Sequence, residues 1–276
     1  MSDLDRRYLQ ELIIAELGVP HSFDAATDVE RRIRFLTDLL ATSNAAGLVL
    51  GISGGVDSST AGRLCQLAVE RVRAAGGQAT FVAMRLPYGV QRDEADAQRA
   101  LEFIAPDRTI IVDVAPASDA LLASVKVETT FPDPAREDFL HGNIKARQRM
   151  VAQYAVAGAI GGLVVGTDHA AEAVMGFFTK FGDGACDATP LSGLTKRRVR
   201  ALAEHLGAPA QVVHKVPTAD LESSAPGLPD EDAFGIRYDD IDDFLEGLPV
   251  DDKAAETIIG WHRRTVHKRA QPIAVS

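Results

Sequence analysis

Cysteine and aromatic residues are scarce in this chain of 276 residues, which has two cysteines, one tryptophan and 6% aromatic residues. Cys65 and Cys186 have no spacing typical of a metal site and predict no disulfide framework, so we expect a reducing, cytoplasmic setting. The uncharged stretch at residues 154–167 is shorter than the roughly 20 residues that cross a bilayer. We therefore expect no membrane partner.

Basic charge is also in deficit, with 29 Lys and Arg against 39 Asp and Glu and a formal net charge of −10. This balance argues against a nucleic-acid partner. The length allows a sizeable buried core. Without an internal repeat or a low-complexity linker, we predict one domain over 1–276, with an N-terminal helical arm over about 1–45.

The Gly-Lys pair of a Walker A loop is absent. In its place, Gly51, Ile52, Ser53, Gly54, Gly55, Val56, Asp57 and Ser58 stand between an apolar strand at 48–52 and an amphipathic helix at 58–74. Strand, glycine turn and helix together are typical of a phosphate site. A carboxylate beside phosphates requires a divalent cation, so Asp57 predicts Mg²⁺. The alternative is a plain turn whose acid suits the helix dipole.

Strands and helices alternate along the chain. Further strands are expected at 79–84, 109–114 and 163–166, with helices at 91–104 and 143–160 between them. This alternation predicts an α/β fold, a doubly wound parallel sheet with helices on both faces. Thr27 and Glu30 form a capping box that predicts a helix start, and residues 211–216 predict another strand.

Two carboxylates and a lysine complete the predicted site. If Asp168 begins a helix, Glu172 lies one turn on and offers the metal a second carboxylate; alternatively Asp168 is an N-cap and Glu172 is solvated. Lys196 begins a helix, where a cation opposes the dipole unless a phosphate binds there. The stretch after Arg85 and the segment 221–235 are candidate lids.

Several motifs resemble known families. The loop Ser-Gly-Gly-Val-Asp-Ser is similar to that of the ATP pyrophosphatases. Taken in order, seven segments between Gly51 and Arg269 resemble the ammonia-dependent NAD⁺ synthetases: GISGGVDS, GNIKARQRM, GTDHAAE, FFTKFGDG, PLSGLTK, KVPTADL and HKR.

This resemblance implies a role for individual residues. It implies ATP binding by residues 51–58, Thr167, Lys196 and Thr218, and Mg²⁺ binding by Asp57 and Glu172. Asp57 and Lys196 are implied to be catalytic. The dinucleotide is implied to contact Arg147, Lys180, Asp187, His267 and Lys268. Without the resemblance, His267 and Lys268 are basic residues that suit the end of a helix, and Arg147 is predicted to be solvated.

The resemblance also implies a reaction. ATP adenylates the carboxylate of nicotinic acid adenine dinucleotide with release of pyrophosphate, and ammonia then displaces AMP to give NAD⁺. A homodimer is implied, with the helix at 143–160 as an interface element. Two alternatives stay open: another ATP pyrophosphatase that amidates or thiolates a nucleotide or tRNA, and a non-catalytic ATP-binding sensor.

Overall fold

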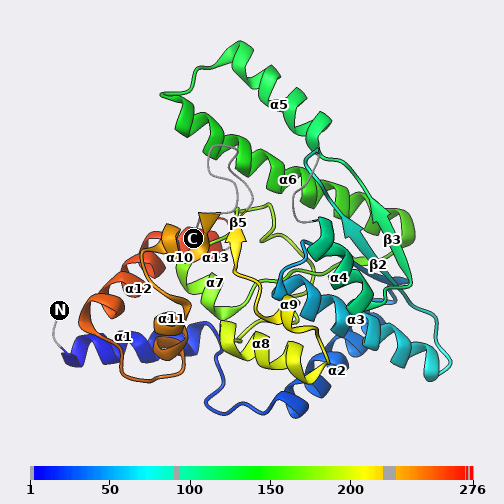
Figure 1. Ribbon diagram of the computed structural model, residues 1–276, viewed down its shortest axis with the longest axis horizontal. Coiled ribbons are helices and arrows are strands. Elements are labelled where there is room, and N and C mark those ends of the chain that lie inside the picture. The colour runs from blue at the N-terminus through cyan, green and yellow to red at the C-terminus, as the bar shows by residue number, and fades with distance from the viewer. Residues whose placement is uncertain (1–2, 90–93, 220–227, 271, 273, 276) are drawn as a thin grey trace.

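A four-stranded parallel sheet forms the centre of the computed structural model, which describes residues 3–89, 94–219, 228–270, 272, 274 and 275 (Figure 1). Its strand order is β3-β2-β1-β4. The strands are β1 (Gly47–Gly51), β2 (Thr80–Arg85), β3 (Arg108–Ile111) and β4 (Leu163–Val164). Because β2 and β4 flank β1 and the chain crosses over through helices, the predicted doubly wound α/β fold is confirmed.

The central strands are buried on both faces. Leu48 and Leu50 pack into one hydrophobic core, and the intervening Val49 packs into another on the opposite face. All three side chains are at most 2% exposed. Such a continuous apolar run is typical of a parallel strand covered by helices on both sides.

Helices cover both faces of the sheet. On one face lie α2 (Ala25–Ser43), α3 (Val56–Ala74), α4 (Glu94–Ile104) and α8 (Lys196–His205). On the other face, Ala157 of α6 (Pro134–Ile160) packs against Val49 and Val164. This arrangement leaves the carboxyl ends of β1 and β4 free to carry a site.

A third core lies away from the sheet and joins distant parts of the chain. Its helices are α1 (Asp3–Glu16), α7 (Ala170–Met175), α10 (Asp230–Phe234), α11 (Tyr238–Leu245) and α12 (Asp252–Arg264). The short α13 (Val266–Arg269) follows α12. Figure 1 shows α1 beside α11 and α12.

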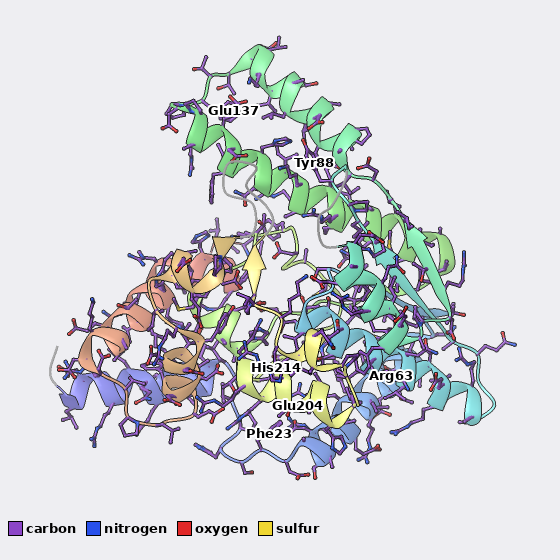
Figure 2. All side chains as sticks on the ribbon, viewed as in Figure 1. Phe23, Arg63, Tyr88, Glu137, Glu204 and His214 are labelled. Atoms are coloured by element: carbon purple, nitrogen blue, oxygen red, sulfur yellow. The ribbon has the colours of Figure 1, made fainter. Side chains whose placement is uncertain are left out.

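The predicted helix at 143–160 is longer than expected. It begins at Pro134, where Asp133 caps it by accepting from the Arg136 N–H at 2.7 Å. A helix that no sequence pattern predicted, α5 (Ala115–Glu128), precedes it. These two helices form a hairpin that projects from the body (Figure 1), and Figure 2 shows Glu137 near its outer end. Since little of either helix is buried, no single apolar stripe marks them in the sequence.

Two local predictions are wrong. Asp24, not Thr27, is the N-cap of α2, because its carboxylate accepts from the Thr27 N–H at 2.9 Å. Residues 211–216 contain no strand; α9 (Ala210–Val213) is a short helix, begun by Pro209.

The predicted loop at 221–235 is partly ordered structure. Strands β5 (Thr218–Ala219) and β6 (Leu228–Pro229) pair antiparallel, and α10 follows directly. Residues 220–227 of this candidate lid, and residues 90–93 of the other, lie outside the described residues.

None of the helices in the described ranges combines the length and the apolar character that a membrane crossing requires.

Candidate active site

The glycine loop leads directly from β1 into α3. Gly55 is the N-cap of α3, and its carbonyl accepts from the hydroxyls of Ser58 and Ser59 at 3.3 and 2.7 Å. The Ser53 N–H donates to the Ser58 hydroxyl at 3.2 Å. These bonds close the loop on itself at the positive end of a helix of 19 residues, where anions bind.

Gly54 is required by the geometry of this turn. Its φ of +86° lies in the left-handed region, and a Cβ there would come within 2.8 Å of the Ala97 nitrogen of α4. A side chain at this position would push α4 away from the loop. The glycine therefore serves the tight turn rather than a direct ligand contact.

Two carboxylates and one ammonium group meet beside the loop. Lys196 Nζ, at the start of α8, lies 2.7 Å from Asp57 Oδ2 and 3.8 Å from Glu172 Oε1. Asp57 comes from the first turn of α3 and Glu172 from the first turn of α7. Glu172 and Asp57 thus face the same ammonium group, and the N-cap of α7 is His169 rather than Asp168.

His169 lies between the same two carboxylates. Its Nε2 is 3.4 Å from Asp57 Oδ1 and 3.4 Å from Glu172 Oε1, and the residue is only 1% exposed. The imidazole and the Lys196 ammonium group therefore flank the two acids. Because two like charges repel when brought together, basic groups on both sides stabilise the pair.

These contacts set the ionisation of the site. Burial alone would raise the pKa of Asp57, but Lys196 and His169 hold it well below its usual range. Burial alone would lower the pKa of His169, whereas Glu172 and Asp57 raise it to about 10. Burial likewise opposes the charge of Lys196, whose pKa is nonetheless raised by Asp57 and Glu172. The Asp57 carboxylate is thus ionised at neutral pH.

The backbone of Lys196 is held by a buried acid. Asp242 of α11 accepts from the N–H groups of Lys196 and Arg197 at 2.9 and 2.7 Å. The Lys196 ammonium group also lies 4.9 Å from the ring centre of Tyr238. With 1% of its surface exposed, Lys196 is fixed in place, which explains a lysine at the unfavourable end of a helix.

The carboxylate cluster fits a divalent cation. Single ligand atoms of Asp57, His169 and Glu172 all lie within 4.8 Å of one another. Asp57 Oδ1 is buried and has no hydrogen-bond partner among the described residues. An unsatisfied buried carboxylate oxygen next to a second carboxylate is a donor set suited to Mg²⁺.

A cavity of about 620 Å³ opens over the loop and these carboxylates. The predicted ATP-site residues on its wall are Gly51, Ile52, Ser53, Gly55, Val56, Asp57, Ser58, Thr167 and Lys196, with Glu172 beside them. Thr218, also predicted to bind ATP, is in β5 and directly follows Pro217, which lines the cavity. The volume is within the range of ligand pockets.

The predicted dinucleotide residues are more scattered. Lys268 lines the cavity, and its ammonium group donates to the carbonyls of Gly176 and Phe178, each at 2.8 Å. Arg147 is exposed on α6 and donates to the Lys180 carbonyl at 3.1 Å.

Asp187 and His267 are exposed as well. Asp187 accepts from the Val164 N–H at 2.7 Å, at the end of β4, and His267 lies on α13. As far as the described residues define the cavity, Arg147, Lys180, Asp187 and His267 are not on its wall.

Four site residues were assigned no role from the sequence: His169, Arg85, Asp183 and Asp230. Arg85 donates to the Ile52 carbonyl at 2.7 Å and so fixes the end of β1. Asp183 lines the cavity, and Asp230 accepts from the Tyr238 hydroxyl at 3.1 Å. His169 belongs to the segment GTDHAAE, in which only the acidic residues were considered as ligands. Asp230 is far from this segment in sequence and reaches the site through tertiary packing.

Comparison with known proteins bears out the resemblance. Residues 28–272 match the family model for NAD synthase. The ammonia-dependent NAD⁺ synthetase of Streptomyces coelicolor is 65% identical over 96% of this chain and 97% of its own length. That of Burkholderia mallei is 61% identical over 99% of this chain and 96% of its own length.

Solved structures agree in fold. A crystal structure of NAD⁺ synthetase from Burkholderia pseudomallei has a TM-score of 0.84 and 59% identity, covering 97% of this chain and 98% of its own. A structure of NMN synthetase from Francisella tularensis has a TM-score of 0.79 and 35% identity, covering 92% of this chain and 99% of its own.

Proposed function

The chain belongs to the NAD synthase family, and we propose that it amidates nicotinic acid adenine dinucleotide with ammonia at the cavity over residues 51–58. ATP activates the carboxylate, and the products are NAD⁺, AMP and pyrophosphate. The observation that carries this proposal is the meeting of Asp57, Glu172 and Lys196 at the N-terminus of α3.

ATP binds with its phosphates against residues 51–58. The helix N-terminus attracts negative charge, and the serine hydroxyls of the loop offer hydrogen bonds. Thr167 on the cavity wall contacts the nucleotide, and so does Thr218 of β5, which directly follows the wall residue Pro217. Lys196 lies 2.7 Å from Asp57 and is placed to neutralise the departing pyrophosphate.

Asp57 and Glu172 hold Mg²⁺, and the unsatisfied Asp57 Oδ1 supports this assignment. When bound, the ion neutralises phosphate charge and makes pyrophosphate a better leaving group. Asp57 and Lys196 are therefore the catalytic residues of the proposal.

The chemistry proceeds in two displacements. The dinucleotide carboxylate attacks the α-phosphorus of ATP, and pyrophosphate leaves. Ammonia then attacks the activated carbonyl carbon, and AMP leaves with the electron pair of the broken C–O bond. The protein aligns the reactants and neutralises their charge, and it contributes no covalent nucleophile.

The dinucleotide spans the cavity and the neighbouring surface of α6. Lys268 lines the cavity, whereas Arg147, Lys180, Asp187 and His267 are placed outside its wall. These five residues could bind one substrate, although they do not line one cavity, if a second copy of the chain completes the site. A homodimer through the hairpin of α5 and α6 supplies that surface.

The whole chain acts as one synthetase domain in the cytoplasm. Support comes from Glu172, whose helix packs in the third core, and from Asp57, whose helix packs on the sheet. The two cores thus contribute to one site. Cys65 is a free, buried cysteine, which suits a reducing compartment.

A substrate assay tests the function. The protein is incubated with ATP, Mg²⁺ and ammonium, with either nicotinic acid adenine dinucleotide or nicotinic acid mononucleotide as acceptor, and NAD⁺, AMP and pyrophosphate are followed. We expect stoichiometric NAD⁺, AMP and pyrophosphate from the dinucleotide. Preferential turnover of the mononucleotide, or of another acceptor, would assign a different substrate; no turnover of any acceptor would favour the ATP sensor.

A substitution at Asp57 tests the assignment of the metal ligands. Asp57→Asn keeps the size of the side chain but removes its charge, so pyrophosphate release should fall on the order of a hundredfold to a thousandfold. Asp38→Asn, at the solvent side of α2, is the matched control and should leave the rate unchanged. Near-normal turnover of Asp57→Asn contradicts the assignment.

A further inference from the structure

A further lysine lies on the wall of the large cavity. Lys215 lines this cavity together with Ser53, Gly55 and other residues of the phosphate loop, and 22% of its side chain is exposed. Its ammonium group lies 2.9 Å from Oδ2 of Asp96, which belongs to the first turn of α4. Lys215 is therefore open to a ligand and is also held by a carboxylate of the fold.

Asp96 places this lysine beside the phosphate loop. The first turn of α4 packs so closely against the loop that a Cβ on Gly54 would lie 3.0 Å from the Asp96 carbonyl carbon. Lys196, in contrast, contacts Asp57, which belongs to the first turn of α3. Lys215 is thus anchored on the α4 side of the loop and Lys196 on the α3 side.

The backbone on both sides of Lys215 is anchored as well. Val213, at the end of α9, is 1% exposed and belongs to the hydrophobic core on the sheet. Two residues after Lys215, the Pro217 carbonyl accepts from the Asp230 N–H at 3.1 Å. Ordering a flexible segment weakens binding, so a lysine whose main chain is already placed loses less freedom when it meets a ligand.

The group around Lys215 carries a surplus of positive charge. Asp96 also forms an ion pair with Arg99, so one carboxylate faces two cations. Lys196 has no such surplus, because two carboxylates lie within 3.8 Å of its ammonium group. An anion that enters the cavity therefore meets uncompensated positive charge at Lys215.

The terminal phosphates of ATP are the anions that fit this position in the proposed reaction. They lie there against residues 51–58, and cleavage between the α- and β-phosphates adds negative charge to pyrophosphate. We propose that Lys215 binds the β- and γ-phosphates of ATP and stabilises pyrophosphate as it departs. This inference rests on the proposed function and adds a second phosphate-binding lysine to Lys196.

Lys215 acts by contact and charge alone. An ammonium group has three N–H donors, so a lysine that is held by a carboxylate can still donate to a phosphate oxygen. The electron pair of the broken P–O bond leaves on pyrophosphate, and the ammonium group balances part of the new charge without transferring a proton.

Two variants test the contact through binding, without turnover. Lys215→Met removes the charge and keeps an unbranched side chain, whereas Lys215→Arg keeps the charge. Isothermal titration calorimetry with Mg²⁺ present measures the Kd for two nucleotides. The first is α,β-methylene ATP, which cannot release pyrophosphate, and the second is AMP, which has no β- or γ-phosphate.

We expect a loss of affinity that depends on the terminal phosphates. In Lys215→Met, the Kd for α,β-methylene ATP should rise about tenfold or more, while the Kd for AMP stays within about twofold of that of the unchanged protein. Lys215→Arg should recover part of the lost affinity. Lys253→Met, exposed on α12, is the matched control and should alter neither Kd.

A second measurement needs no variant. Acetic anhydride acetylates accessible lysines, and mass spectrometry of peptides gives the extent of reaction at each one. With Mg²⁺ present, α,β-methylene ATP should protect Lys215 from acetylation, whereas AMP should not. The exposed Lys253 should react equally in both samples. If Lys215→Met loses the circular dichroism of the folded chain, this comparison decides alone.

The outcomes distinguish this inference from the proposed function. In a folded Lys215→Met variant, an unchanged Kd for α,β-methylene ATP, or an equal rise in the Kd for AMP, overturns the role of Lys215. So does a Lys215→Arg variant that binds no better than Lys215→Met, or equal acetylation of Lys215 with the two nucleotides. If Lys215 passes these tests but the unchanged protein forms no NAD⁺, the proposed function fails and the phosphate contact stands.

Discussion

At the scale of single residues, charge compensation defines the site. Asp57, Glu172 and Lys196 come from three different helices, and each would be unstable alone in a partly enclosed position. Together they form a pair of acids flanked by Lys196 and His169, with Nζ–O and Nε2–O distances between 2.7 and 3.8 Å. Removing any one member leaves the others with unbalanced charge.

His169 is expected to position the two carboxylates for the cation. His169→Gln keeps a polar group but removes the ring that touches both acids, so the affinity for Mn²⁺ should fall about tenfold. Titration of free Mn²⁺ by electron paramagnetic resonance measures this directly, without turnover. His205→Gln, exposed on α8, is the control. Equal Mn²⁺ affinity in both variants would remove His169 from this role.

Asp168 should make the stability of the fold depend on pH. Burial and Glu172 raise its pKa to about 7 from the usual 3.8. Between these two values the folded chain binds a proton at Asp168 that the unfolded chain has lost, so stability falls as pH rises through the window.

The corresponding variant removes this dependence. The difference in the free energy of unfolding, Asp168→Asn minus the unchanged protein, should increase by on the order of 3 kcal/mol from pH 4.5 to pH 8. Urea titrations at both pH values measure the difference. A constant offset between the two proteins across this range would contradict the assigned shift.

Some residues of the site were predictable from the sequence and others were not. Asp57 was identifiable because it replaces the lysine of a Walker A loop, and Glu172 because it follows Asp168 by one helical turn. The burial of Asp168 and His169 was not predictable, because the cavity that they line is also bounded by residues at the end of α1 and in α13, which are remote in sequence. Local spacing carries no information on such packing.

At the scale of elements, strands and helices of the sheet were predictable because their apolar patterns are regular. The strand β1 and helix α3 were expected within two residues of their observed starts. In contrast, α5 and the first turns of α6 were missed because this hairpin buries little of its surface. Asp24 was overlooked as a cap because Thr27 and Glu30 form a similar pattern three residues later.

The end of α7 depends on a glycine. Gly176 has a φ of +62°, and a Cβ there would lie 2.3 Å from the Thr265 side chain. Gly176→Ala should therefore lower the free energy of unfolding by roughly 3 kcal/mol, from backbone strain and from the clash. Urea denaturation measures the loss.

Gly235→Ala is the matched control for this element. Gly235 has a φ of +70° but no atom within 4 Å of a Cβ, so only the strain of about 1–2 kcal/mol remains. If both variants lose the same stability, the contact between α7 and Thr265 contributes nothing.

At the scale of the whole molecule, the hairpin of α5 and α6 is the most prominent feature (Figure 1). It projects beyond the body and exposes Leu121, Val127 and Val151, with 44%, 79% and 52% of their surface accessible. An exposed apolar surface on a projecting element is typical of an interface. The prediction of a homodimer concerns this surface.

A charge on the hairpin should disrupt the predicted homodimer. Leu121→Glu is expected to shift the protein from dimer to monomer at micromolar concentration, because a buried unpaired carboxylate is costly. Sedimentation equilibrium measures the mass. Leu12→Glu on α1, where the leucine is 48% exposed, is the control and should leave the mass unchanged. Identical masses for the two variants would assign the interface elsewhere.

The pairing of α1 with α11 and α12 has a consequence for synthesis. Gln10 donates to the Phe244 carbonyl at 2.7 Å, and Arg6 lies 2.8 Å from Asp252. Both contacts can form only after more than 200 further residues have been synthesised. The helix that carries Glu172 packs into this same core. The nascent chain can therefore form the sheet and its phosphate loop early, while α1 stays unpaired. We therefore expect the carboxylate pair of Asp57 and Glu172 to take its final geometry only near the end of translation, after the phosphate loop itself has formed.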